Sequence, residues 1–77
     1  MKLVVLSPEK ELLSCDVDAV ELPGKKGRFE VLPGHAPLLS SLTEGVIRYE
    51  ADAQRQLLHV DGGFVRVQND EITVCAI

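Results

Sequence analysis

The sequence predicts an all-β protein, a two-sheet β-sandwich built from short, mostly antiparallel strands. Short apolar runs are separated by clusters of Gly, Pro, Asn and Asp along the whole chain, which is typical of all-β domains. Several runs alternate apolar and polar residues with period two, as half-buried strands do. No window carries a sustained helical period, and the best case, residues 50–58, is short. A small barrel has the same strand spacing and is the alternative architecture.

Nine strands are expected in order, each bounded by residues that break or turn the chain. Ser7–Pro8 ends the first strand and Pro23–Gly24 ends the third. Asp61–Gly62–Gly63 separates the seventh from the eighth. Asn69–Asp70 between the last two predicts a tight hairpin, because both residues tolerate positive φ. The expected strands are 2–6, 12–15, 17–22, 28–32, 38–42, 46–51, 56–60, 64–68 and 72–77.

The alternation also predicts which side chains face the core. Val65 and Val67 share one face of their strand, and Phe64 lies on the other. In the last strand, Val74 faces opposite to Cys75, so both faces carry apolar side chains. This pattern predicts a central strand or an interface.

Length and composition limit the kind of protein. The chain has 77 residues, 45% of them hydrophobic and 26% charged, which predicts one folded domain over residues 1–77 with a thin core. A net charge of −4 argues against nucleic-acid binding, although Lys25, Lys26 and Arg28 form a local basic cluster. The N-terminus lacks the apolar run of a signal peptide, and no run is long enough to span a membrane. We expect a soluble, cytoplasmic protein that docks on larger assemblies.

Catalytic, cofactor and metal sites are not expected. The sequence contains no phosphate-binding glycine motif and no GxSxG. His35 and His59 lie far apart, with no closely spaced ligand pair. Cys15 and Cys75 lie in apolar surroundings, which predicts two buried free thiols.

Residues 22–39 form the most informative segment. They include three of the four prolines and three of the six glycines, which predicts two stiff loops around a short strand. The second loop presents His35 and then Leu38 and Leu39. Stiff loops lose little entropy on binding, so these leucines are candidates for an interface. They equally fit the core together with Leu42, and the residue pattern alone leaves both interpretations open.

This segment resembles a known family, the N-terminal β-sandwich domain of the epsilon subunit of F-type ATP synthases. The family pattern includes LPG, PGHAPLL and GGF motifs and a closing Val-Thr-Val strand. The matching stretches, in chain order, are Leu22-Pro23-Gly24, residues 27–40 with Pro33-Gly34-His35-Ala36-Pro37-Leu38-Leu39, Gly45-Val46-Ile47-Arg48, residues 62–68 with Gly62-Gly63-Phe64, and Ile72-Thr73-Val74. Glu30 stands where the family favours glycine, which argues against a required positive φ at this position. Arg66 stands where the family often has Glu.

The resemblance implies a non-catalytic rotor subunit of the central stalk. It would link the gamma subunit to the c-ring at the cytoplasmic face of the membrane, as a peripheral part of the complex, and help couple proton transport to ATP synthesis. Matching residue by residue, the expected c-ring interface is Lys25, Lys26, Gly27, Arg28, Phe29 and Glu30. The expected gamma-subunit interface is His35, Ala36, Pro37, Leu38 and Leu39. Many relatives continue into two helices, which we expect this protein to lack.

Two other classes of function stay open from the residues. One is a small β-sandwich module that binds an anionic ligand or a protein partner through Lys25, Lys26 and Arg28. The other is a small enzyme or metal protein that uses His35 and His59.

Overall fold

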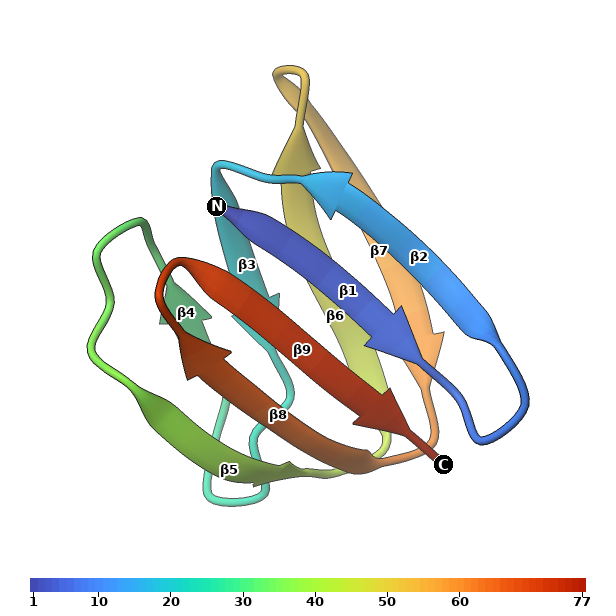
Figure 1. Cartoon of the computed structure of the whole chain (residues 1–77). Coiled ribbons are helices and arrows are strands. Elements are labelled where there is room, and N and C mark those ends of the chain that lie inside the picture. Colours follow the sequence, from blue (N-terminus) through green and yellow to red (C-terminus); the bar gives the residue numbers. More distant parts are fainter.

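The nine predicted strands are all present in the computed structural model, which describes residues 1–77. No helix is formed, and the strands make two facing sheets (Figure 1). The strands are β1 (Lys2–Leu6), β2 (Glu11–Asp16), β3 (Ala19–Leu22), β4 (Phe29–Val31), β5 (Leu38–Leu42), β6 (Gly45–Ala51), β7 (Gln54–Val60), β8 (Gly63–Gln68) and β9 (Glu71–Ala76). The predicted β-sandwich is confirmed.

The larger sheet has five strands in the order β2-β1-β9-β8-β5. Its strands pair antiparallel except for β1 and β9, which run parallel side by side (Figure 1). The last strand is therefore central, as its two apolar faces predicted. The first and last strands of the chain meet in the middle of this sheet, so the fold joins residues that are far apart in sequence.

The smaller sheet has four antiparallel strands in the order β4-β3-β6-β7. The two sheets are joined at one corner, where Gly24 forms an isolated bridge with Leu42 of β5. Two backbone hydrogen bonds support this corner, from Lys25 N to the Ser41 carbonyl and from Thr43 N to the Pro23 carbonyl. The loop after β3 is thereby held against the edge of the other sheet.

The core between the sheets consists only of apolar side chains. It contains Leu3, Val5, Val17, Val20, Leu22, Val31, Leu42, Ile47, Val60, Val65, Val67, Ile72, Val74 and Ala76. These residues alternate along their strands, since successive side chains point to opposite faces. Val65 and Val67 are buried and Phe64 is exposed, as predicted. No polar side chain is buried, so hydrophobic packing alone specifies this core.

Two hairpins turn through consecutive residues with positive φ. Asn69 and Asp70 have φ values of 53° and 58°, which confirms the predicted tight turn between β8 and β9. Asp52 and Ala53, at 53° and 62°, form an equivalent turn between β6 and β7. The sequence predicted a longer connection here, residues 52–55, because alanine gives no signal for positive φ. As a result β7 begins two residues earlier than predicted, at Gln54.

The bounds of β2, β4, β6, β8 and β9 differ from the predicted ranges by one residue, and two further details also differ. The third strand begins at Ala19 and not at Val17, because Val17 lies in a buried connection where its N–H bonds to the Met1 carbonyl. The thiols of Cys15 and Cys75 are free, but both are half-buried. Cys15 packs against the core, and Cys75 lies on the outer face because it alternates with buried Val74.

Candidate interaction surface

The loop between β3 and β4 is a rigid turn that depends on two glycines. Gly27 N donates to the Gly24 carbonyl at 3.0 Å, and Gly27 has a φ of 134°. A Cβ on Gly24 would lie 2.5 Å from the Gly27 carbonyl oxygen, so this site admits only glycine. The tightness of this turn forces the side chains of Lys25 and Lys26 outward.

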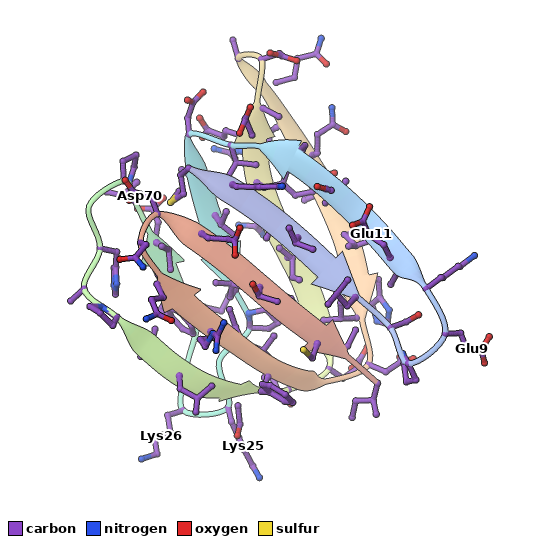
Figure 2. The ribbon with its side chains drawn as sticks, in the orientation of Figure 1. Glu9, Glu11, Lys25, Lys26 and Asp70 are labelled. Atoms are coloured by element: carbon purple, nitrogen blue, oxygen red, sulfur yellow. The ribbon has the colours of Figure 1, made fainter.

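The six residues expected at a c-ring interface divide into groups with different surroundings. Lys25 and Lys26 are exposed and form no ion pair, and they project away from the body of the domain below β5 (Figure 2). Phe29 is half-buried against the core. Glu30 is exposed on β4, and its φ is not positive, as its departure from glycine predicted. The lysines are therefore the side chains most available to a partner.

Arg28 differs from the two lysines because its guanidinium is bonded within the chain. Its Nε donates to Glu21 Oε1 at 2.6 Å, and its Nη2 donates to the Val46 carbonyl at 2.7 Å. Arg48 Nη1 lies 3.2 Å from the same Glu21 oxygen. The hydrogen bond from Arg28, reinforced by the positive charges of Arg28 and Arg48, lowers the pKa of Glu21 below its ordinary value. The sequence predicted a basic cluster here but not this acidic partner.

The loop before β5 is fixed to the turn between β8 and β9. Gly34 N donates to Asp70 Oδ1 at 2.8 Å, and Gly34 has a φ of 83°. His35 N donates to the Leu32 carbonyl at 3.1 Å, and His35 Nδ1 lies 2.7 Å from the Ala36 carbonyl, to which it can donate. In Figure 2 Asp70 lies at the β8–β9 turn, beside this loop. The loop is thus stiff, as its proline and glycine content predicted.

The five residues expected at a gamma interface also separate by their surroundings. His35, Ala36 and Pro37 are exposed in the loop. Leu38 is half-buried and packs on the core, while Leu39 is 69% exposed on the outer face. The core interpretation is therefore confirmed for Leu38 and Leu42 and is wrong for Leu39, while the interface interpretation stays a prediction. Leu38 packs with the core like Leu42, and Leu39 is available to a partner.

The two predicted surfaces meet at one corner of the sandwich. A hollow there is lined by Lys25, Lys26, Leu39, Ser40 and Ser41. The hydrogen bond from Lys25 N to the Ser41 carbonyl, 3.0 Å long, holds its two sides together. Residues that are more than ten positions apart in the sequence thus form one surface, with cationic side chains beside an apolar one.

Sequence reasoning missed an apolar groove that continues from this corner across the outer face of the five-stranded sheet. The groove has a volume of about 610 Å³ and includes Leu6, Phe64, Cys75 and Ile77. Phe64 is 49% exposed, and it lies opposite Ser41 on β5 and Cys75 on β9. The alternation of residues 64–68 did predict that Phe64 faces away from the core, which is one sign of such a groove. The cross-strand register that collects these side chains could not be derived from the sequence.

Other side chains that could carry chemistry do not assemble into a site. The structure contains no group of three His, Cys, Asp or Glu residues placed to hold a metal ion. His59 Nε2 lies 2.6 Å from Glu44 Oε2, and both side chains are exposed. Burial is the main reason that the pKa of the Cys15 thiol is raised, which disfavours the reactive thiolate.

The structure has no helix with the length and apolar character needed to span a membrane.

Comparison with known proteins identifies the family. The whole chain, residues 1–77, matches the family described as "ATP synthase, Delta/Epsilon chain, beta-sandwich domain". The chain belongs to this family. The ATP synthase epsilon chain of Desulfitobacterium hafniense is 42% identical over 74 residues, which cover 96% of this chain and 56% of that protein. The epsilon chain of Leptospira interrogans is 38% identical, with 96% of this chain and 58% of that protein covered. The chain thus spans little more than half the length of these relatives.

Two solved structures share the fold of this chain. A chain of the Euglena gracilis mitochondrial ATP synthase superimposes with a TM-score of 0.88 at 21% identity, covering 96% of this chain and 48% of that chain. A chain of the Tetrahymena thermophila mitochondrial ATP synthase central stalk and c-ring superimposes with a TM-score of 0.81 at 14% identity. The match covers 99% of this chain and 62% of that chain. At these identities the likeness shows the fold alone.

Proposed function

We propose that this chain is a non-catalytic rotor subunit of an F-type ATP synthase, which links the gamma subunit to the c-ring in the central stalk. It would thereby help couple proton transport to ATP synthesis, as a peripheral subunit at the cytoplasmic face of the membrane. The observation that carries the proposal is the match of the entire chain to the epsilon-type β-sandwich. The solved relatives belong to assemblies described as F1 with the c-ring and as central stalk with the c-ring.

Several features of the site support this proposal. The exposed lysines of the Lys25–Arg28 loop suit a polar or acidic partner, for which charges at the rim of an interface set orientation and association rate. Leu39 and Phe64 suit a permanent contact, whose centre is more apolar than ordinary surface. A rotor subunit transmits torque, and both loops are held by hydrogen bonds to the opposite sheet or to a neighbouring turn.

Co-purification with the gamma subunit tests the proposal. We expect the chain to be retained on immobilised gamma subunit from the same ATP synthase, and His35→Ala combined with Leu39→Asp to reduce retention. Leu39 is preferred to Leu38 for this test, because Leu38 packs on the core and an aspartate there would destabilise the fold. Arg55→Ala, on the outer face of the other sheet, is the matched control. Retention that is unchanged in the folded double variant would refute the gamma assignment of residues 35–39.

A second candidate is a module that binds an anionic ligand, favoured by the hollow in which Lys25 and Lys26 lie beside two serines. This function predicts salt-sensitive binding of a ligand such as inorganic phosphate in the absence of any ATP synthase subunit. Isothermal titration of the isolated chain with phosphate separates the two functions, because a stalk subunit needs no such ligand.

A further inference from the structure

The Arg28 side chain closes a network that joins the lysine loop to two strands of the four-stranded sheet. Its Nε donates to Glu21 Oε1 on β3 at 2.6 Å, and its Nη2 donates to the Val46 carbonyl on β6 at 2.7 Å. Two separate donors of one guanidinium thus bind two adjacent strands. Such a forked contact fixes direction as well as distance, because the guanidinium is planar and rigid.

Glu21 is shared between Arg28 and a second arginine. Arg48 lies directly opposite Glu21 in the β3–β6 pairing, and its Nη1 is 3.2 Å from the same carboxylate oxygen. Opposite charges in this cross-strand position stabilise the pairing. The single negative charge of Glu21 is therefore shared by two arginines and offsets part of the positive charge of each, so Arg28 has less positive charge to offer a partner than its place in the sequence suggests.

The other end of the loop is held by the backbone. Lys25 N donates to the Ser41 carbonyl, and Gly27 N donates to the Gly24 carbonyl, both at 3.0 Å. Lys25 and Lys26 lie between these anchors and Arg28, and neither lysine forms an ion pair. In Figure 2 both lysines extend from the tip of the loop. The arrangement separates a fixed arginine from two free ammonium groups.

We propose that Arg28 is a positioning residue, which with Glu21 and Arg48 holds the loop in the conformation that presents Lys25 and Lys26 to a carboxylate-bearing partner surface. The inference rests on the proposed function, in which that partner is the c-ring. This proposal gives two different roles to the basic residues of the expected c-ring interface. The lysines contact the partner, and Arg28 acts through them by fixing the loop.

Amide hydrogen exchange measured by NMR on the isolated chain tests the positioning role without a partner. Arg28→Ala and Glu21→Gln are expected to speed exchange of the Lys25 and Gly27 amides about two- to fivefold, the range expected from the loss of exposed ion pairs. Arg28→Lys should give an intermediate rate, because an ammonium group can bond Glu21 but cannot reproduce the fork. Lys26→Ala is the matched control and should leave both rates unchanged. Unchanged exchange in Arg28→Ala would overturn the proposal.

Binding to the detergent-solubilised c-ring at several salt concentrations tests the division of roles. Lys25→Ala and Lys26→Ala should each weaken binding and flatten its salt dependence, because each removes a charge from the contact. Arg28→Ala should weaken binding about two- to fivefold with the wild-type salt dependence retained. A flattened dependence in Arg28→Ala would make it a contact residue and overturn the proposal. If the wild-type chain does not bind the c-ring, the proposed function fails, and the exchange experiment still decides the role of Arg28.

Discussion

The Asp70 carboxylate accepts a hydrogen bond from the backbone N–H of Gly34 at 2.8 Å. This contact joins the turn between β8 and β9 to the loop before β5, across 36 positions of sequence. It explains how a loop of exposed residues, His35 to Pro37, is held without burial. Asp70 thus has two roles: it forms part of the β8–β9 turn, and it holds the loop that carries the expected gamma-subunit interface.

Removal of this contact should destabilise the domain. Asp70→Ala removes the oxygen that accepts the hydrogen bond from the Gly34 N–H. It also places alanine at a φ of 58°, a conformation that aspartate tolerates better than alanine does. We expect the free energy of unfolding to fall by about 1–2 kcal/mol. Urea denaturation followed by circular dichroism measures this change. Asp70→Asn is the control, because it keeps Oδ1 and tolerates positive φ; equal midpoints for Asp70→Ala and the wild type would contradict the prediction.

Glu21 should make stability depend on pH in the acid range. Its pKa in the folded protein lies below the ordinary value of 4.5, chiefly because Arg28 donates a hydrogen bond to the carboxylate. The stabilisation is therefore fully present above about pH 4.5 and is lost as the pH falls through the lower, folded pKa. NMR titration of the Glu21 carboxyl group measures the pKa directly. Arg28→Ala should return it toward 4.5, and a titration that Arg28→Ala leaves in place would disprove the stated cause.

Two glycines with positive φ should respond very differently to substitution. A Cβ on Gly63 would lie 2.0 Å from the Cys75 carbonyl oxygen, and the φ of 130° is unfavourable as well. We expect Gly63→Ala to lower the free energy of unfolding by about 3 kcal/mol or more. Gly34→Ala has open space around its Cβ and should lower it by only about 1 kcal/mol. Thermal unfolding of both variants makes the comparison, and equal melting temperatures would show the packing argument to be wrong.

Leu39 and Leu42 lie on the same strand but should differ in their effect on stability. Leu42 is 5% exposed in the core, so Leu42→Ala should lower the free energy of unfolding by about 2–4 kcal/mol. Leu39 is 69% exposed, so Leu39→Ser should change it by less than about 0.5 kcal/mol. Denaturation of the two variants gives the stability. A large loss of stability in Leu39→Ser would mean that Leu39 is a core residue and not part of an interface.

The number of strands, their order along the chain and most of their inward faces could be predicted from the sequence. Alternation of Val65 and Val67 with Phe64 fixes the faces of β8, and the Asn69–Asp70 turn fixes its hairpin with β9. The turn at Asp52–Ala53 could not be predicted, because alanine is rarely found at positive φ and the surrounding sheet decides its conformation. The positions expected at the two interfaces follow from the family resemblance, and they remain predictions.

The sequence by itself determined that residues 1–77 are all-β and which loops rich in proline and glycine they display, because these properties depend on local periodicity and on the φ limits of proline and glycine. Only the tertiary structure decided which side chains lie beside those loops. Strand register collects Leu39, Phe64 and Ser41 on one face, and the bridge of Gly24 to Leu42 places the lysines beside them. In the other sheet, the antiparallel pairing of β3 with β4 brings Arg28 to its partner, Glu21, seven residues earlier. Such contacts join separate strands, and the pairing of strands is a property of the whole sheet that no local pattern contains.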